Sequence, residues 1–593
     1  MSELTLTDQT ISELLSWSPT TPAGANKTGL RILFLVSAHN GLSQRAWIAL
    51  TELEHQVTVA VVDSAASMEA AVCEHDPQLV VCPFLKTRIP DSIWRTRRCL
   101  VVHPGPRGDR GPSSLDWAIE LGVTEWGVTV LLADDVFDAG EVLATRVFPM
   151  REAGKSSIYR HEVRRAAIEA LLDAVDGLTG PTERGQYAGA ASSGRARPLM
   201  TQDVRAINWQ ADSSESVLRK IRAAEGHPGV LDTIDGHAFH LFGGHLERAL
   251  RGIPGELIVQ RDDAICRATV DGAVWTTQLK RQDTPTERHF KLPAVVALQR
   301  AGVALKLPES TVALDAPLPA DHTYREISYE ERGDVGYLSF DFYNGAMSTE
   351  QCQRLRAAYA HARGRDTKAI VLCGGNDYFS NGIQLNVIEA AYDPAAESWR
   401  NLTAIDDLVR DIVETDSHLV ISALTGDAAA GGVPLALAAD YVLAHEDVVL
   451  NPYYGHMGGL YGSEYWTYLL PRRIGAAMTA RLTQPPFRPV GARQAANIGL
   501  LSGVLGAGVE EFQARVRAFA KRIARDGLHR ARLEDKRRRR AHDERLKPLQ
   551  AYRSEELAQC LQCFFGADSA YHDARRRFVY KAGAPQESLR RAA

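Results

Sequence analysis

Short apolar runs alternate with segments of helical spacing in two separate parts of this chain. In the first part the runs are Arg31–Ser37 (RILFLVS), Val57–Val62, Leu79–Cys82 and Cys99–Val102, with helical spacing over Gln44–Glu54. Continuous apolar runs of this length are typical of strands buried on both faces. The alternation of strands and helices therefore predicts a doubly wound, Rossmann-like α/β sheet in this part.

The same alternation returns in the second half of the chain, after a middle stretch of different character. From about residue 200 to 310 the apolar runs are short, strand-like and separated by turn residues, which predicts a small OB-like β-barrel. After Glu510 the pattern becomes helical and highly charged, which predicts a helical tail. The runs that indicate the second α/β domain are Val335–Phe340, Ala369–Leu372, Leu419–Leu424 and Tyr441–Ala444.

Two stretches of low apolar content separate these parts. Residues Gly177–Pro198 are rich in Gly, Ala, Ser, Thr and Arg, a composition typical of an exposed linker, and Ala313–His322 is rich in Pro and Ala. A chain of 593 residues is also too long for one hydrophobic core. We therefore predict an α/β multidomain protein with four parts, at residues 29–180, 200–312, 323–525 and 526–593.

The composition excludes several classes of protein. Hydrophobic residues make up 45% and charged residues 24%, enough to bury large cores, so extensive disorder is excluded. The net charge of -5 is spread thinly and favours neither nucleic acid nor an anionic membrane, so small molecules are the expected partners. No apolar stretch approaches the ~20 residues that span a bilayer. With eight scattered cysteines, typical of reduced thiols, these features predict a cytoplasmic protein.

Two local patterns each have two interpretations. Cys560 and Cys563 form a CxxC pair without a second pair or a histidine cluster, so core packing is favoured over a zinc or redox site, and no metal is predicted. The basic run Lys536–Arg540 (KRRRR) has the composition of a nucleic-acid patch, but acidic residues flank it. A solvated helix face is therefore the favoured interpretation of this run.

A histidine directly follows the fourth apolar run of the first α/β part. His103 opens a Gly/Pro-rich loop, and Asp138 lies 35 positions further on, before a glycine. The carboxyl ends of strands are where α/β sheets bind ligands. A lone histidine would more often satisfy a local turn, but this one belongs to a larger pattern. The pattern comprises His103–Pro104, Arg110–Pro112, Gly127–Thr129 and Asp138–Gly140.

These spaced segments resemble the formyltransferases that use 10-formyltetrahydrofolate, over about residues 30 to 175. The likeness continues at Arg205–Trp209 and Ile221–Val230, which resemble the opening of the C-terminal domain of methionyl-tRNA formyltransferase. The resemblance implies that His103 and Asp138 are the catalytic pair. Such a histidine can donate to the developing oxyanion and exchange protons near neutral pH, while the carboxylate orients it.

One position departs from the formyltransferase pattern. The asparagine of the family falls on Val101, which has no side-chain donor. Either another donor replaces it, with Asn40, Arg110 and Ser113 as the candidates, or the reaction is altered. The resemblance also implies that folate lies along the backbone from Cys82 through Leu85 to Arg88.

A second constellation of glycine-containing segments lies in the second α/β part. The segments Asn344–Gln351, Tyr378–Leu385 and Gly426–Asp440 each follow a predicted strand. Single glycines usually permit tight turns, but together these segments resemble the crotonase (enoyl-CoA hydratase/isomerase) superfamily over roughly residues 325 to 525. The resemblance implies coenzyme A (CoA) as ligand, with Gly382 in its site. It also implies an oxyanion hole made by the backbone N–H groups of Ile383 and Gly431.

The crotonase pattern is also altered at its catalytic positions. The first glutamate of the hydratases falls on Pro434, which has no acid or base function, so alkene hydration is not expected. Tyr454 and Glu464 lie in the active-site stretch of the family and are the candidates for the acid/base group. A buried structural tyrosine and a surface glutamate are the alternatives. Near the C-terminus, Lys581 lies in a segment that resembles the crotonase tail, which can hold CoA.

The order of the two constellations in one chain resembles the hydrogenase maturation factors of the HypX/HoxX family. This resemblance implies formyl transfer from 10-formyltetrahydrofolate to CoA, followed by release of carbon monoxide (CO) for the nickel–iron hydrogenase centre. It also implies the hydrogenase maturation machinery as a partner. Two alternatives stay open: a formyltransferase that acts on an amine and has a regulatory CoA-binding half, and a non-enzymatic maturation carrier.

Overall fold

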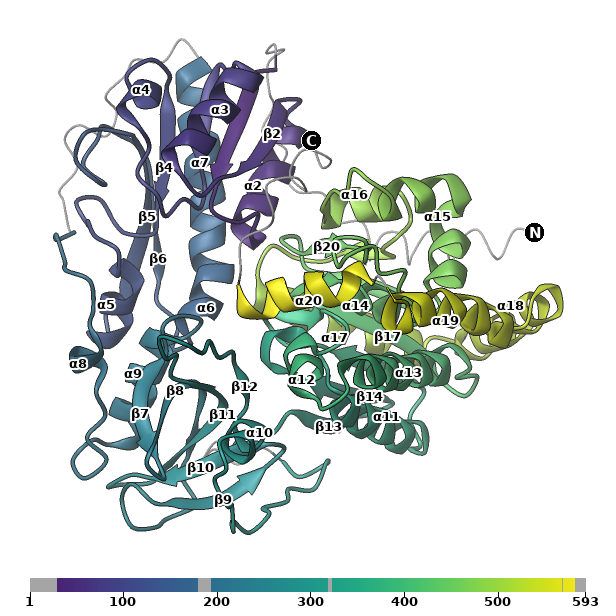
Figure 1. The fold of residues 1–593 in the computed structure, drawn as a ribbon. Helices are drawn as coiled ribbons and strands as arrows, with labels where there is room; N and C mark the ends of the chain where they lie inside the picture. The colour runs from purple at the N-terminus through teal and green to yellow at the C-terminus, as the bar shows by residue number, and fades with distance from the viewer. Residues whose placement is uncertain (1–28, 180–193, 318–322, 568, 582–593) are drawn as a thin grey trace.

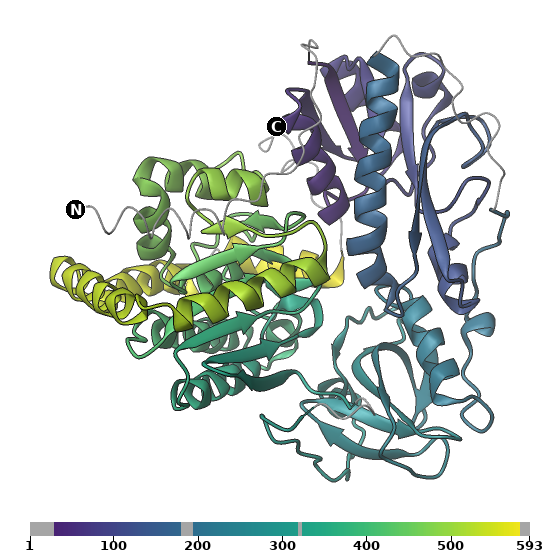
Figure 2. The ribbon, with the colours of Figure 1, turned by 180° about the vertical axis from the view of Figure 1, so that it is seen from behind.

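A computed structural model describes residues 29–179, 194–317, 323–567 and 569–581. Figures 1 and 2 show an N-terminal α/β part, an antiparallel β part below it, and a C-terminal α/β part beside both. Most of the predicted linker at 177–198, and residues 582–593 of the predicted tail, lie outside the described residues. No helix among the described residues is long and apolar enough to cross a membrane.

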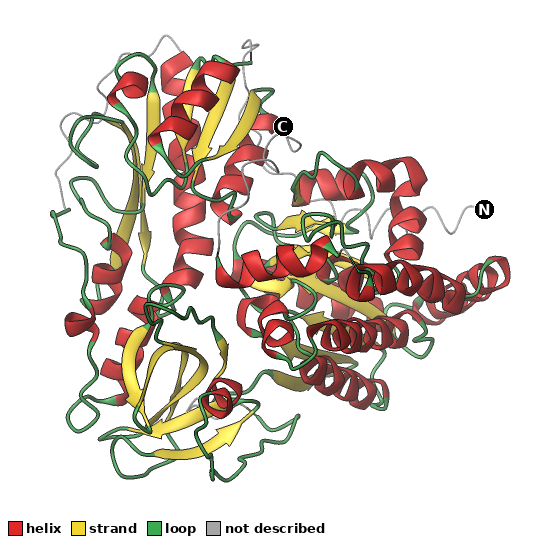
Figure 3. Cartoon of the chain, in the orientation of Figure 1, coloured by secondary structure: helices red, strands yellow, loops and turns green. Residues whose placement is uncertain are grey.

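The N-terminal part has one six-stranded sheet in the order β2-β1-β3-β4-β5-β6. The pairs among β2, β1, β3 and β4 are parallel, whereas β5 and β6 are antiparallel to their neighbours. Helices cover both faces of this sheet, as the prediction of a doubly wound fold requires (Figure 3). The strands are β1 (Arg31–Val36), β2 (Gln56–Val61), β3 (Leu79–Cys82), β4 (Cys99–His103), β5 (Glu125–Leu132) and β6 (Val142–Pro149).

The apolar character of the strands explains why helices pack on both sides of this sheet. All four residues of β3 are buried, and β1 is exposed only at Arg31. One face packs against α2 (Gly41–Glu52), α5 (Ser114–Glu120) and α7 (Arg164–Thr179), and the other packs against α3 (Ala65–His75) and α4 (Asp91–Trp94). Two short helical turns, α6 (Lys155–Ile158) and the π-helix η1 (Tyr159–Val163), precede α7.

The middle part is an antiparallel sheet in the order β7-β8-β11-β10-β9, with β12 paired to β11. The sequence predicts a small OB-like β-barrel here, and the structure shows an antiparallel β domain at this position. Its core includes Trp209, Phe239 and Leu279. Its elements are α8 (Gln202–Arg205), α9 (Ser214–Ala224), β7 (Val230–Ile234), β8 (His237–Glu247), β9 (Leu257–Arg261), β10 (Ala264–Ala268), β11 (Ala273–Arg281), β12 (Leu292–Pro293) and α10 (Ala294–Arg300).

The C-terminal part has a six-stranded sheet and a smaller four-stranded sheet. The first has the order β13-β14-β15-β17-β19-β22 and the second β16-β18-β20-β21. The strands of the first are β13 (Ile327–Arg332), β14 (Val335–Phe340), β15 (Ala369–Cys373), β17 (Leu419–Leu424), β19 (Tyr441–Ala444) and β22 (Gly503–Val504). Those of the second are β16 (Tyr378–Ser380), β18 (Asp427–Ala429), β20 (Val449–Asn451) and β21 (Val490–Gly491).

Helices surround these two sheets and continue into the helical tail that the sequence predicts (Figure 3). With these helices, the fold class predicted from the sequence is confirmed. They are η2 (Tyr343–Gly345), α11 (Thr349–Arg363), α12 (Leu385–Ala390), α13 (Pro394–Val413), α14 (Gly432–Leu437), α15 (Trp466–Thr483), α16 (Ala492–Asn497), α17 (Val509–Arg525), α18 (His529–Leu546), α19 (Leu549–Phe565) and α20 (Ala570–Tyr580).

Ion pairs join the N-terminal and C-terminal α/β parts. Asp377 lies just before β16. Its Oδ1 accepts a hydrogen bond from Ser157 at 2.6 Å and lies 3.1 Å from His161 Nε2, and its Oδ2 accepts from Arg160 at 3.3 Å. Arg164, at the start of α7, donates to Asp427 at 2.8 Å. Burial opposes ionisation of Asp377, but His161 and Arg160 outweigh it and lower its pKa to about 2. This junction brings the carboxyl edge of the first sheet near the crotonase-like part.

Candidate active sites

His103 lies at the carboxyl end of β4, where it is buried between two carboxylates. Its Nε2 is 3.0 Å from Asp109 Oδ2, and its Nδ1 is 3.4 Å from Asp138 Oδ2. A neutral imidazole carries one N–H, so it can donate to only one of these carboxylates, whereas the imidazolium can donate to both. The arrangement suits a group that gains and loses a proton during reaction.

The loop after β4 is shaped closely around this histidine. A Cβ atom at Gly105 would come within 2.5 Å of His103 Nε2 and 2.4 Å of Asp109 Oδ2, so no larger residue fits there. Thr129 on β5 donates to the Gly105 carbonyl at 2.9 Å and fixes the loop. Asp138 has a φ of 54° and accepts from the Gly111 N–H at 3.4 Å. The His103–Asp138 pair that the sequence predicts is therefore brought together.

Asp109 is the residue of this site that the sequence reasoning missed. Its side chain is fully buried, and its Oδ1 lies 3.8 Å from Arg197 Nε. Its signal in the sequence is weak, because an acidic residue in a Gly/Pro-rich loop is usually solvated.

The three candidates for the donor missing at Val101 have other contacts in the structure. Asn40 caps α2 by accepting from the Ser43 N–H at 3.0 Å, and Ser113 accepts from the Met200 N–H at 3.1 Å. The backbone of Arg110 bridges to Ala196, and its side chain is exposed. Val101 itself is half-buried in β4. Which group replaces the asparagine stays a prediction.

The loop predicted to hold folate follows β3 at the same sheet edge. Ser37 ties it to β1, because the Ser37 N–H donates to Phe84 O at 2.8 Å and the Lys86 N–H donates to Ser37 Oγ at 2.9 Å. Cys82 is buried and Leu85 half-buried, while the exposed Arg88 pairs with Asp91 at 3.4 Å. The role of Cys82, Leu85 and Arg88 in binding folate remains a prediction.

In the C-terminal part, the predicted oxyanion-hole residues lie next to each other. Gly382 has a φ of 76°, and a Cβ atom there would lie 3.1 Å from Gly431 N. Ile383 follows Gly382 and bridges to Met347, while Gly431 caps the start of α14. Pro434 is buried inside α14. The geometry thus places the Gly382–Ile383 backbone against the Gly431 amide at one point, without a side-chain acid from α14.

Glu464 stands directly over this point and is not a surface residue. A Cβ atom at Gly431 would come within 2.2 Å of Glu464 Oε1, and Glu464 is 1% exposed. Tyr454 donates from its hydroxyl to Glu464 Oε2 at 2.8 Å. Burial, followed by the charge of Asp406, raises the pKa of Glu464 to about 8, while burial and the charge of Glu464 raise the pKa of Tyr454. The predicted pair therefore forms one buried hydrogen-bonded unit.

Two further carboxylates lie behind Glu464 and were not predicted from the sequence. Asp406 on α13 accepts from the Glu464 N–H at 2.7 Å, and Glu556 on α19 accepts from the Tyr465 N–H at 2.9 Å. Burial raises the pKa of each to about 7. The helical spacing held a signal, because Glu556 falls on the same face of α19 as Cys560 and Phe564, and that face is buried.

Cations gather between the two sites. Lys291 has its ammonium 3.8 Å from the Phe242 ring centre and donates to Tyr343 Oη at 3.1 Å. Burial lowers its pKa to about 8; the charge of Glu225 opposes this, and the charges of Lys581, Arg160 and Lys155 act with burial. Lys581, predicted from the sequence, follows α20 and is exposed, with its ammonium 4.1 Å from the Phe578 ring centre. This junction can therefore accept an anionic ligand.

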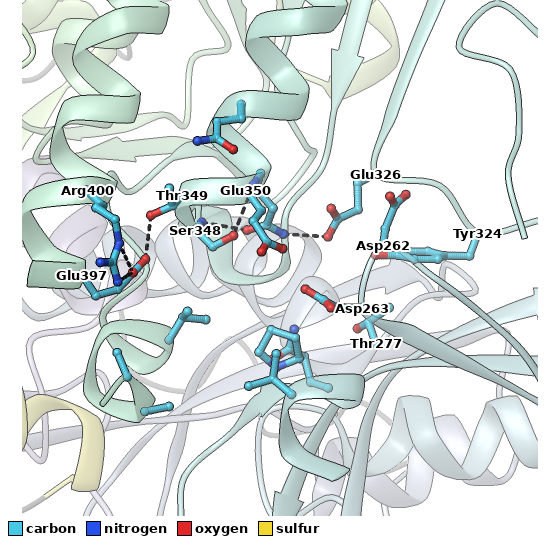
Figure 4. Close-up of a pocket in the computed structure, with 18 residues that line it drawn as sticks. Asp262, Asp263, Thr277, Tyr324, Glu326, Ser348, Thr349, Glu350, Glu397 and Arg400 are labelled. Atoms are coloured by element: carbon cyan, nitrogen blue, oxygen red, sulfur yellow. Dashed lines mark hydrogen bonds and ion pairs between the residues drawn. The ribbon is translucent and has the colours of Figure 1, made fainter. Parts of the chain in front are cut away.

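A separate pocket of about 460 Å³ lies between the middle and C-terminal parts (Figure 4). Its acidic lining includes Asp263 and Glu326, whose pKa values burial raises to about 6 and about 7. Arg354 pairs with Glu326 and Asp262 at 2.5 Å each. None of the site residues predicted from the sequence lines this pocket, so it is distinct from both candidate sites.

The basic run lies on a surface helix, and the CxxC pair packs inside the C-terminal part. Lys536 belongs to α18, a helix with no buried residue, and pairs with Asp440 at 2.6 Å. Cys560 is buried, with its Sγ 3.2 Å from the Gly462 carbonyl, and Cys563 is half-buried.

Three family models match successive parts of the chain. They are "Formyl transferase" over residues 32–175, "Formyl transferase, C-terminal domain" over 199–288 and "Enoyl-CoA hydratase/isomerase" over 338–569. The hydrogenase maturation factor HoxX of Bradyrhizobium diazoefficiens is 47% identical over 93% of this chain and 95% of its own length. The chain belongs to the HypX/HoxX family.

Solved structures of HypX from Aquifex aeolicus have the same architecture. The structure of that HypX in complex with tetrahydrofolic acid is 41% identical, with a TM-score of 0.89, and covers 94% of this chain and 97% of its own. A methionyl-tRNA formyltransferase of Pelobacter propionicus is 28% identical over 36% of this chain and 68% of its own length. Membership in the HypX/HoxX family thus explains why this chain combines formyltransferase domains with a crotonase-like domain.

Proposed function

We propose that this HypX/HoxX protein makes CO for nickel–iron hydrogenase assembly. It would transfer a formyl group from 10-formyltetrahydrofolate to the thiol of CoA and then split the formyl thioester into CO and CoA. The observation that carries this proposal is the buried Tyr454–Glu464 pair over Gly431. The hydratase pattern of the crotonases would instead place a catalytic glutamate at the position of Pro434, on α14.

In the first step, His103 would take the thiol proton and deliver it to the folate nitrogen that leaves. A carbon–sulfur bond forms at the formyl carbon and the carbon–nitrogen bond breaks, so formyl-CoA and tetrahydrofolate result. Asp138 and Asp109 both lie within reach of the imidazole and would orient it through this transfer. The complex of A. aeolicus HypX with tetrahydrofolic acid supports folate as the donor.

In the second step, Glu464 would act on the formyl proton. The amides of Ile383 and Gly431 would polarise the thioester carbonyl, and the ionised Glu464 would remove the proton from the carbon. The carbon–sulfur bond then breaks with its electron pair on sulfur, CO leaves, and Glu464 returns the proton to the thiolate. A raised pKa favours this use, because it makes the ionised carboxylate a stronger base.

The cations between the two sites support CoA as the acceptor. CoA carries a diphosphate and a further phosphate, and Lys291 and Lys581 bring positive charge to the junction, next to Arg160, which also pairs with Asp377. A thioester formed at the first site would then have its phosphates held while its acyl end reaches the second.

The deciding experiment supplies purified protein with 10-formyltetrahydrofolate and CoA and detects CO by its effect on a haem absorption spectrum. We expect CO only when both substrates are present. If formyl-folate is consumed without CoA, and a formylated amine accumulates, the amine formyltransferase is supported instead. If neither substrate is consumed, the protein is a carrier.

A further inference from the structure

The backbone at Glu464 adopts a conformation that its residue types do not favour. Glu464 has a φ of 61° and Tyr465 a φ of 59°, so two consecutive residues with side chains are in the left-handed region. Each such residue costs about 1–2 kcal/mol relative to the right-handed conformation. A strained turn of this kind persists only where its surroundings hold it, and it is a common feature of functional sites.

Buried carboxylates hold this turn through its backbone amides. The N–H of Ser463 donates to Glu464 Oε2 at 2.9 Å, the N–H of Glu464 to Asp406 Oδ1 at 2.7 Å, and the N–H of Tyr465 to Glu556 Oε2 at 2.9 Å. The second oxygen of Glu556 accepts from Thr467 N at 2.8 Å. Consecutive amides that point at anions are a recurrent way to fix a tight turn.

One hydroxyl joins the two carboxyl groups. Ser463 Oγ lies 2.9 Å from Asp406 Oδ2 and 3.2 Å from Glu556 Oε2. The single hydrogen of this hydroxyl is directed at two acceptors, so the shorter contact, to Asp406, is the stronger of the two. Asp406 and Glu556 therefore form one acidic unit around Ser463, next to Glu464.

Little positive charge opposes this unit from the surrounding helices. Arg553 on α19 lies 3.6 Å from Asp406, but its closer partner is Asp407 at 2.6 Å. Three other titratable groups that the charge of Glu464 affects are Tyr454, Cys352 and Cys560. Each of these is neutral near pH 7, because burial raises the pKa of all three.

We propose that Asp406 and Glu556 are positioning residues for Glu464, which fix its strained turn over Gly431 and place negative charge beside its carboxylate. This inference rests on the proposed release of CO. Removal of either negative charge relieves repulsion on the Glu464 carboxylate, so Glu464 ionises at lower pH. Glu464 must be ionised to accept the formyl proton. The rate of CO release should therefore rise with pH to a plateau, with its midpoint at the pKa of Glu464.

The test measures CO release from supplied formyl-CoA across pH 5 to 10 in wild type, Glu556→Gln and Asp406→Asn. We expect the midpoint of the acidic limb near pH 8 in wild type and about one pH unit lower in each variant. Glu555→Gln is the matched control, because Glu555 precedes Glu556 on α19 and is exposed, with a surface ion pair to Lys547. Its midpoint should equal that of wild type.

A second readout does not depend on CO. The infrared band of protonated carboxyl groups should be weaker near neutral pH in Glu464→Gln than in wild type. In Glu556→Gln the band that remains should disappear at lower pH than in wild type. If either variant fails to fold, the other and Ser463→Ala carry the test. Activity reduced equally at every pH, with unchanged midpoint and infrared titration, would overturn the positioning role. Absence of CO from wild type, with the infrared shift present, would instead overturn the proposed function.

Discussion

The two candidate active sites both contain buried carboxylates, but they balance the negative charge in different ways. In the first, Asp109 and Asp138 face the two nitrogens of one histidine, and Arg197 stands behind Asp109. In the second, Glu464 is backed by Asp406 and Glu556 with one partly engaged arginine.

The difference predicts a different proton carrier in each site. Where a base lies between carboxylates, they can orient it and stabilise its charged form, so the histidine is the expected proton carrier. Where no base lies between them, burial raises the pKa of Glu464 to about 8, and this carboxyl group is the expected carrier. Replacement of His103 should therefore stop only formyl transfer, and replacement of Glu464 should stop only CO release.

The largest effect is expected for Glu464→Gln. The amide keeps the shape of the side chain but cannot take a proton, so CO release from supplied formyl-CoA should fall by about 10³–10⁴-fold. Formyl transfer from folate, followed as tetrahydrofolate release, should stay within twofold. CO output within tenfold of wild type would show that another group removes the formyl proton.

The converse change is His103→Gln. Formyl transfer should fall by about 10²–10³-fold, because an oxyanion donor and the proton carrier are both altered. The same preparation should release CO from supplied formyl-CoA at the wild-type rate. Normal consumption of formyltetrahydrofolate by this variant would place the first reaction elsewhere.

The sequence pointed to the expected carriers more readily than to their surroundings. His103, Asp138, Tyr454 and Glu464 stand in segments that resemble those of known families, and such segments can be recognised in a single chain. Asp406 and Glu556 come from helices that pack together only in the tertiary fold, so their only local signal is an acid on an apolar helix face. The strand alternation predicted the fold class for the same reason: it follows from local burial.

The comparison also predicts an opposite pH response for stability in two regions. The pKa of Glu464 is raised in the folded state, so its stabilising contribution is complete below its unfolded pKa near 4.5 and is lost as the pH rises toward 8. Between pH 5 and pH 8 the wild type should lose about 1–3 kcal/mol more than Glu464→Gln, measured by calorimetric unfolding. Equal pH dependence in the two proteins would mean that Glu464 titrates normally.

The smallest effect is expected at the junction, where a carboxylate is fully compensated by cations. The pKa of Asp377 is lowered to about 2, so its contribution is present at neutral pH and is lost only as the pH falls from about 4 toward 2. Because Asp377 is 27% exposed, Asp377→Asn should cost only about 1 kcal/mol at pH 7.

Salt separates this junction effect from loss of packing. In 1 M salt the melting temperature of the wild type should move part of the way toward that of Asp377→Asn, because salt screens a partly buried ion pair, although less than an exposed one. Glu414→Gln, which removes an exposed pair with Arg410 inside the C-terminal part, is the matched control. It should change neither the melting temperature nor the shift of the melting temperature with salt. If Asp377→Asn keeps its deficit in high salt, the contact is held by its hydrogen bond from Ser157 rather than by charge. The junction would then resemble the Glu464 site, where hydrogen-bond geometry and not charge balance fixes the carboxylate.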